Sequence, residues 1–116
     1  MFTINLNNLY FYSFHGLYPE EKILGGEYEV NAVILVDSED NVKDISQTVD
    51  YTAIYSVIQK QMSAPAELLE TLAQQMVNAI GLLDKRIRNV SINIKKVHPP
   101  IPQFTGSIGV TFSKEF

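Results

Sequence analysis

The amino-acid sequence predicts an α+β fold with the element order ββααββ, in which two helices cover one face of a four-stranded antiparallel sheet. Near both ends of the chain, apolar and polar residues alternate, which is the period of a half-buried strand. In the middle, apolar residues recur every three or four positions, as on one face of a helix. Helices grouped between pairs of strands favour α+β over an alternating α/β architecture. Because 116 residues is the length of one domain, we expect residues 1–116 to form a single domain.

The first two strands are predicted over residues 2–14 and 27–36. The first begins with apolar residues at alternate positions, Phe2, Ile4 and Leu6. The second has an apolar residue at every other position, namely Tyr28, Val30, Ala32, Ile34 and Val36. We expect the two strands to pair as a long antiparallel hairpin. Residues 17–26, which connect them, are too many for a tight turn.

Two helices are predicted to follow. Asp50 suits the N-cap of the first, whose apolar stripe is Tyr51, Ile54, Tyr55, Ile58 and Met62. Pro65 suits the first position of the second helix, with Glu67 in its first turn. The apolar stripe of that helix is Leu69, Leu72, Ala73, Met76, Ile80 and Leu83.

The last two strands are marked by Val90, Ile92 and Ile94, and then by Ile108, Val110 and Phe112. A sheet of four strands leaves two edges with unpaired backbone groups. Only 19% of the residues are charged, against an average near ~25%. This low charge favours a surface that other copies cover, so we expect a homo-oligomer that pairs edge to edge into a ring.

Composition excludes several function classes. The net charge of -4 argues against nucleic acid and against anionic membrane surfaces as partners. The chain has no cysteine, which rules out disulfides and thiolate chemistry. Its two histidines, His15 and His98, are too few for a three-histidine zinc site. We therefore expect no metal and no cofactor.

No leader pattern is evident in the sequence. The longest apolar run, residues 32–36, is much too short for a membrane-spanning helix, so we expect a cytoplasmic protein.

Lys96 and Glu70 break the apolar patterns around them. Lys96 continues the phase of Ile94, so it should point to the apolar side of the sheet, where burial and the adjacent Lys95 charge favour a neutral amine able to act as a base. The simpler interpretation is that the strand ends at Ile94. Glu70 lies on the flank of its helix, where a helix-dipole carboxylate is the simpler interpretation. It also suits a carboxylate that accepts two adjacent N–H groups of a planar heterocycle.

Three further residues have ordinary interpretations when taken alone. Tyr51 is typical of a core tyrosine, Glu21 of a solvated loop charge, and His15 of a strand end. No glycine-rich phosphate loop, nucleophile elbow or metal-spaced carboxylate cluster is present.

The sequence resembles dihydroneopterin aldolase of folate biosynthesis in four blocks that follow in order: residues 14–21 (FHGLYPEE), 44–51 (DISQTVDY), 68–73 (LLETLA) and 94–102 (IKKVHPPIP).

The resemblance implies the tunnelling fold (T-fold), whose ββααββ subunits join edge to edge into rings that stack as an octamer, with the pterin pocket between subunits. It implies that Lys96 and Tyr51 transfer protons, and that Tyr51 also stacks near the pterin. Glu70, with the backbone of Leu69, would anchor the pterin ring, and Glu21 would reach the substrate side chain. The implied reaction is retro-aldol cleavage of 7,8-dihydroneopterin into 6-hydroxymethyl-7,8-dihydropterin and glycolaldehyde. The pterin C=N accepts the electrons, so neither a metal nor a Schiff base is needed.

Two alternatives remain open at this point. One is an epimerase of the same fold acting on dihydroneopterin or its phosphate, although no additional basic residues for a phosphate are evident. The other is a non-catalytic ring-forming module that binds a pterin or purine. The sequence also departs from the family pattern at Gly26, where glutamine is frequent, and at Glu67, where asparagine is common. Both positions concern affinity more than chemistry.

Overall fold

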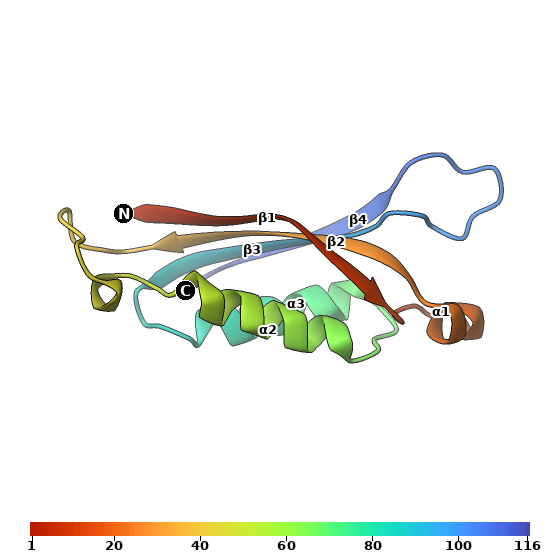
Figure 1. Cartoon of the computed structure of the whole chain (residues 1–116), viewed down its shortest axis with the longest axis horizontal. Coiled ribbons are helices and arrows are strands. Elements are labelled where there is room, and N and C mark those ends of the chain that lie inside the picture. The colour runs from red at the N-terminus through yellow and green to blue at the C-terminus, as the bar shows by residue number, and fades with distance from the viewer.

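The structure, a computed structural model, describes all 116 residues and confirms the predicted α+β architecture. Four strands form one antiparallel sheet in the order β1-β2-β3-β4: β1 (Phe2–Ser13), β2 (Gly26–Val36), β3 (Ile87–Lys96) and β4 (Ile108–Glu115). Helices α2 (Tyr51–Ser63) and α3 (Leu69–Gly81) lie along one face of this sheet (Figure 1). A short 3-10 helix, η1 (Ile45–Gln47), precedes α2. The molecule is elongated, with extents of 52 × 24 × 21 Å.

Strand pairing follows the predicted hairpin. β1 pairs with β2 from Phe2 opposite Val36 to Ser13 opposite Gly26, with a bulge between Leu6 and Leu9. The register of the two other pairs aligns Tyr28 on β2, Lys96 on β3 and Ile108 on β4 in one row. This row lies at the end of the sheet where β2 begins and β3 ends, so the sheet carries Lys96 to that end.

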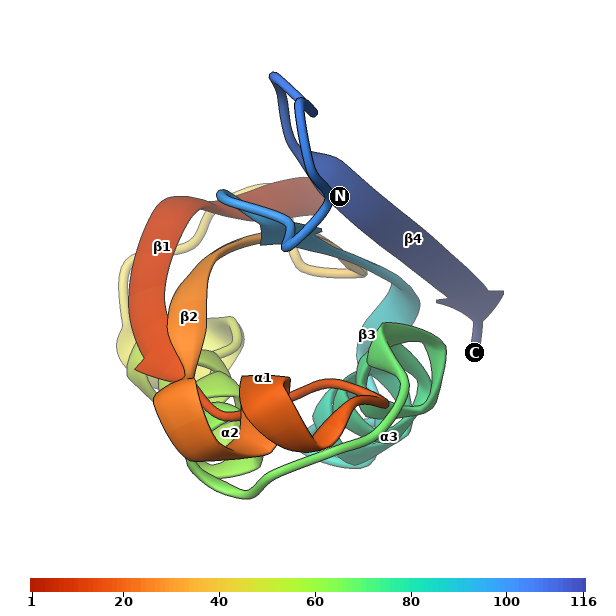
Figure 2. The same ribbon diagram turned by 90° about the vertical axis from the view of Figure 1, so that its right-hand side faces the viewer.

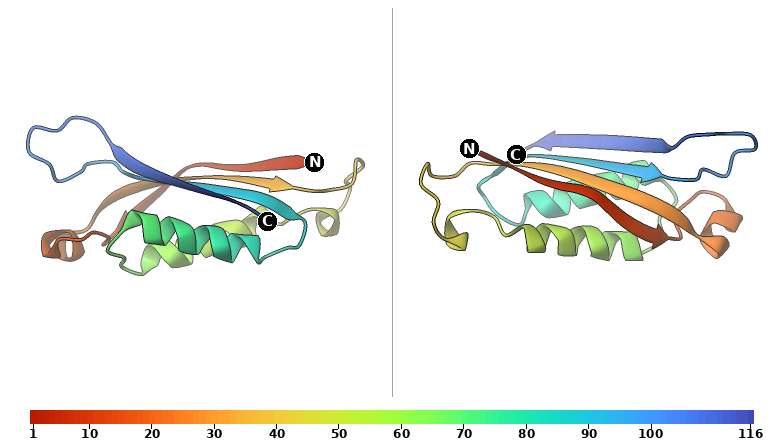
Figure 3. Two further views of the ribbon diagram at one scale, coloured as in Figure 1. Left: turned by 180° about the vertical axis from the view of Figure 1, so that it is seen from behind. Right: turned by 45° about the horizontal axis from the view of Figure 1, so that its top comes forward.

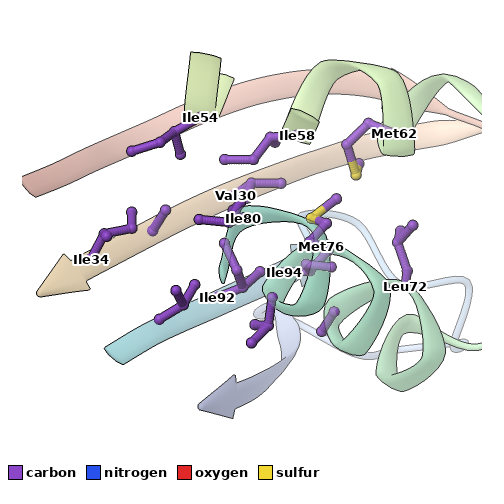
Figure 4. Packing of buried hydrophobic residues seen from close by; sticks show 14 of the residues in the cluster. Val30, Ile34, Ile54, Ile58, Met62, Leu72, Met76, Ile80, Ile92 and Ile94 are labelled. Carbon is purple, nitrogen blue, oxygen red and sulfur yellow. The ribbon is translucent and has the colours of Figure 1, made fainter. Parts of the chain in front are cut away.

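The core lies between the sheet and the two helices (Figure 4). The alternating residues of β2 and β3 are fully buried, as predicted: Val30, Ala32, Ile34, Val90, Ile92 and Ile94. They pack with Ile54, Ile58 and Met62 of α2 and with Leu72, Met76 and Ile80 of α3. Each such aliphatic side chain contributes about 1.5–3 kcal/mol through its removal from water. These positions confirm the predicted stripes of the two central strands and of most of both helices.

Three residues predicted for the apolar stripes of the two helices are not in the core. Tyr51 is 61% exposed and Tyr55 is 37% exposed. Tyr51 is the first residue of α2, and because side chains tilt toward a helix N-terminus, its ring projects beyond the packed layer. Tyr55 stacks instead on Phe11 of β1, with ring centroids 6.2 Å apart. Leu83 lies past the end of α3 at Gly81, which leaves it exposed.

Two helix boundaries differ from the prediction. The connection between the first two strands contains a six-residue helix, α1 (Pro19–Leu24), with proline at its start and two glutamates in its first turn. The helix expected to begin at Pro65 begins at Leu69. The reason is that the peptide group of Ala66 is occupied elsewhere: its N–H donates to His15 Nδ1 and its carbonyl accepts from the Gly16 N–H.

Viewed from the α1 end, the sheet curves around the helices and α1 lies across the end of the molecule (Figure 2). Both chain termini lie toward the opposite end (Figure 3). Strands β1 and β4 form the two edges of the sheet. None of the helices has the length and apolar character required to cross a bilayer.

Candidate functional site

The predicted lysine and the predicted loop glutamate meet at the α1 end of the sheet. Lys96 is the last residue of β3, and its Nζ lies 2.5 Å from Oε2 of Glu21 on α1. The two side chains are only 22% and 11% exposed. The charged group that faces the Lys96 amine is therefore the Glu21 carboxylate. The sequence had instead indicated the neighbouring Lys95 as the nearby charge. The amine and the carboxylate therefore hold each other in position before a ligand binds.

A cavity of about 390 Å³ adjoins this pair. Its polar side chains are Lys96 and three glutamates, Glu21, Glu67 and Glu70. Its apolar walls come from four segments: residues 17–18 before α1, residues 68–69 at the start of α3, residues 99–101 after β3, and Ile108 and Val110 of β4. A volume in the range of about 300–1,000 Å³ with a few converging polar groups is typical of a small-molecule site.

Glu70 and Leu69 enter this cavity from the first turn of α3. Leu68, at the N-cap, forms no side-chain capping bond, so the first backbone N–H groups of the helix have no capping partner from that residue. Leu69 is buried, and the exposed Glu70 carboxylate forms no ion pair. The carboxylate is thus available to accept hydrogen bonds from a ligand that occupies the cavity.

Tyr51 lies away from this cavity within the protomer. The cavity is at the C-terminal end of α2, where Ser13 Oγ donates to the Met62 carbonyl 2.9 Å away. Tyr51 begins the same helix, and eleven residues at a rise of 1.5 Å separate its Cα from that of Met62 by roughly 16 Å. The structure therefore brings together Lys96, Glu21, Leu69 and Glu70, and it does not bring Tyr51 to them.

A smaller cavity of about 120 Å³ lies beside the same ion pair and is lined by His15, Tyr28, Glu21 and Lys96 among others. Burial, followed by the charge of Glu21, raises the pKa of the Tyr28 phenol to about 12. Burial lowers the pKa of His15, the Met62 backbone carbonyl acts to raise it, and the nearby Lys96 charge lowers it further. Both rings are therefore neutral at pH 7, and the Lys96–Glu21 pair lines both cavities.

Sequence reasoning did not single out the apolar walls of the larger cavity. Tyr18 and Ile101 are 63% and 47% exposed and line it. The available signal was the placement of large apolar residues in loops, Leu17–Tyr18 before a proline and Ile101 between two prolines. Exposed apolar residues of this kind mark binding surfaces when they lie together.

Comparisons with known proteins agree with this site and fold. The family model described as dihydroneopterin aldolase (FolB) matches residues 4–113. The chain belongs to the dihydroneopterin aldolase family. A dihydroneopterin aldolase of Staphylococcus epidermidis is 30% identical over 118 residues, which cover 97% of this chain and 95% of the relative. The Bacillus subtilis dihydroneopterin aldolase is 25% identical over 118 residues, covering 99% of this chain and 98% of that one.

The solved structures extend the agreement to the fold of a dihydroneopterin aldolase. The Escherichia coli dihydroneopterin aldolase in complex with neopterin superimposes with a TM-score of 0.85 at 17% identity, covering 98% of this chain and 99% of that chain. At such low identity the likeness concerns the fold. It confirms the T-fold that the sequence resemblance implied. No group of three or more histidine, aspartate or glutamate side chains is arranged to hold a metal ion.

Proposed function

We propose that this family member cleaves 7,8-dihydroneopterin into 6-hydroxymethyl-7,8-dihydropterin and glycolaldehyde, as a step of folate biosynthesis. The observation that supports the proposal most strongly is the cavity in which Lys96, Glu21 and Glu70 converge. These three residues, far apart in sequence, are the ones that the resemblance assigned to one pterin site. The proposed reaction involves only small water-soluble molecules, which fits a cytoplasmic location.

In this proposal, Glu70 accepts the amino and ring N–H groups of the pterin, and the Leu69 backbone lies beside it. The first turn of α3 suits this role because it presents both groups to the cavity. A carboxylate that accepts two adjacent N–H groups fixes the orientation of the ring as well as its affinity. The trihydroxypropyl side chain then extends toward the Lys96–Glu21 pair, where Glu21 contacts its hydroxyl groups.

Lys96 transfers protons in the proposed chemistry. A proton leaves the hydroxyl on the second side-chain carbon, the bond between the first and second side-chain carbons breaks, and its electron pair moves into the ring C=N to give an enamine. Glycolaldehyde departs with its new C=O group. The enamine carbon then takes up a proton and yields the hydroxymethyl product. The small exposure of Lys96 supports this role, because a positioned group in a partly dehydrated site exchanges protons with substrate rather than with bulk water.

The test is a product assay. Purified protein is incubated with 7,8-dihydroneopterin, glycolaldehyde is quantified, and the pterins are separated by chromatography that resolves the two side-chain epimers. Release of glycolaldehyde in step with hydroxymethyldihydropterin is the expected result. Dihydromonapterin as the dominant product would indicate an epimerase, and pterin binding without turnover would indicate a binding module. Either outcome would overturn the proposal.

We also propose that Tyr51 joins the site from an adjoining copy, in an oligomer that is an octamer of two stacked rings. Two features support this: Tyr51 is 61% exposed at the far end of its own protomer, and β1 and β4 are unpaired sheet edges. No nucleic acid or membrane partner is part of the proposal.

Subunit mixing tests the shared site. Lys96→Ala and Tyr51→Phe proteins are each impaired, and they are dissociated together and reassembled at equal amounts. If one protomer supplies Lys96 and its neighbour supplies Tyr51, about a quarter of the sites regain both residues. If both residues acted within one protomer, mixing would restore no activity.

A further inference from the structure

The motif His15–Gly16 has no role in the proposed chemistry, yet it is buried and forms hydrogen bonds with two other segments. His15 is 0% exposed, and only Ser13 is a second buried polar side chain. The Ala66 N–H donates to His15 Nδ1 at 3.0 Å, and the Gly16 N–H donates to the Ala66 carbonyl at 2.8 Å. The Tyr28 hydroxyl donates to the His15 carbonyl at 2.7 Å. The segment before α1 is therefore fastened both to the segment before α3 and to β2.

Gly16 also forms the surface against which Glu21 packs. Its φ is +147°, a conformation that side chains rarely adopt. A Cβ at this position would lie 2.5 Å from both Cβ and Cδ of Glu21 and 2.6 Å from Oε1. Any side chain at residue 16 thus displaces the carboxylate that pairs with Lys96.

We propose that His15 and Gly16 are positioning residues that hold Glu21 against Lys96 and fix the α1 wall of the cavity to the segment that leads into Glu70. His15 acts through its Nδ1 acceptor and its backbone, and Gly16 acts through its lack of a side chain. Neither residue lines the larger cavity, and His15 lines only the smaller one. The activity readout of this inference rests on the proposed aldolase function.

The bond to Ala66 fixes the tautomer of His15. Because Nδ1 accepts a hydrogen bond, the ring proton of the neutral imidazole is on Nε2. Nε2 makes no well-formed hydrogen bond within the chain, but the Met62 carbonyl lies near enough to the ring to act on the pKa of His15. The ring also lines the small cavity together with Lys96 and Glu21. Two roles of His15 can therefore be distinguished. In the first, called the clamp, Nδ1 accepts the Ala66 N–H and holds the two segments together. In the second, Nε2–H donates directly to a group in the small cavity.

Protonation of His15 would put a proton on Nδ1, and an N–H there could not accept the hydrogen bond from the Ala66 N–H. The clamp therefore requires the neutral ring. The charged and titratable groups that surround the small cavity are Glu20 and Glu21 from α1, Tyr28 and Glu27 from β2, Lys96 from β3, and His98 after it. Burial lowers the pKa of His15, which keeps the ring neutral at pH 7.

The decisive experiment compares His15→Asn with His15→Gln. The side-chain amide of asparagine reaches the position of Nδ1, whereas that of glutamine reaches the position of Nε2. We expect His15→Asn to keep kcat/KM within about threefold of wild type, and His15→Gln to lose about tenfold or more, as supporting hydrogen-bond partners do in other sites. The reverse order would assign a direct role to Nε2 and overturn the clamp. Equal losses in both variants would mean that the ring contributes packing only, and would also overturn it.

Gly16→Ala gives an independent test, with Gly106→Ala as its matched control. Gly106 also has a positive φ, of +135°, but a Cβ there would meet only the Phe104 ring, at 3.7 Å and 3.8 Å. Both variants carry the same kind of backbone strain, and only Gly16→Ala displaces Glu21. We expect at least a tenfold larger loss of kcat for Gly16→Ala at comparable thermal stability. Equal activity of the two variants would refute the role of Gly16.

Nitrogen chemical shifts of the His15 ring provide a readout that does not depend on activity. In the wild-type protein we expect Nδ1 to be the unprotonated nitrogen and Nε2 to carry the proton at pH 7. The opposite tautomer would overturn the clamp even if the protein cleaves dihydroneopterin. Conversely, a wild-type protein with the expected tautomer and no cleavage activity would count against the proposed function and leave the hydrogen-bonded clamp supported.

Discussion

Replacing Lys96 with methionine separates the structural from the chemical role of the ion pair. Methionine keeps most of the length of the side chain and removes the charge, so Glu21 stays 11% exposed with no cation at 2.5 Å. Removing one partner of a fully buried pair costs about 3–5 kcal/mol. Because Lys96 and Glu21 both keep some exposure, we expect a loss of about 1–3 kcal/mol in the free energy of unfolding.

The loss of turnover should be much larger than this loss of stability. A positioned proton-transfer group contributes about 10²–10⁴-fold to a rate, so we expect kcat to fall by that factor. Pterin affinity, measured by fluorescence titration, should change little because Glu70 still anchors the ring. Unfolding in urea gives the stability, and the glycolaldehyde assay gives kcat.

Lys95→Met is the matched control, since Lys95 precedes Lys96 in the same strand and alternates to the opposite face. We expect it to change stability by less than about 0.5 kcal/mol and to leave kcat nearly unchanged. The double variant Lys96→Met/Glu21→Gln should recover part of the lost stability, because it removes the unpaired charge, but none of the lost turnover. Equal kcat values for the two single lysine variants would refute the assignment of Lys96.

Three other predictions follow from the same geometry. Glu70→Ala should weaken pterin binding by about 10²-fold, since it removes two charge-assisted hydrogen bonds, whereas Glu67→Ala on the same cavity should have a smaller effect; a titration that ranks them the other way contradicts the anchor role. Hydrogen bonds from Arg86 hold the pKa of Asp84 at about 2, below its usual 3.8, so the stability from this pair is complete above pH 4 and lost as the pH falls toward 2. Urea unfolding from pH 5 to pH 2 should show this loss in the wild type and less of it in Asp84→Asn. Ile92→Ala should cost about 2–5 kcal/mol in the same assay, since Ile92 is 0% exposed, and a cost below 1 kcal/mol would show that the core collapses around the deletion.

Elements with many repeats of one period could be predicted from the sequence. β2 and β3 alternate over several residues with every second side chain in the core, and this alternation is a local property of the chain. The helix α1 spans only six residues and has no buried residue, so it leaves no periodic signal. The start of α3 depends on the bonds between Ala66 and the His15–Gly16 segment, about fifty positions away in sequence. Such long-range competition for a peptide group cannot be seen in a local pattern.

In the candidate site, too, local patterns could be predicted from the sequence and long-range contacts could not. The phase of β3 predicted that Lys96 would be partly buried, and the structure agrees. The partner of Lys96 could not be predicted from that phase, because Glu21 lies 75 residues earlier on a helix without a periodic signal. The resemblance named both residues, but only the fold shows that they pair and that Glu70 lines the same cavity.

For Tyr51, the burial that the periodicity predicts differs from the exposure seen in the single protomer, and this difference supports an oligomer. Its place on the α2 stripe predicts burial, yet it is 61% exposed. Edge strand β1 shows a related excess of exposed aromatic side chains, with Tyr10 at 60% and Tyr12 at 58%. In a chain with few charged residues, apolar surface at an unpaired sheet edge and at a helix start is accounted for together if neighbouring copies cover it. The proposed ring of copies accounts for both observations through one kind of subunit contact, and it also brings Tyr51 to the cavity of a neighbouring copy. Reassembly of the Lys96 and Tyr51 variants therefore tests the assembly and the chemistry in one measurement.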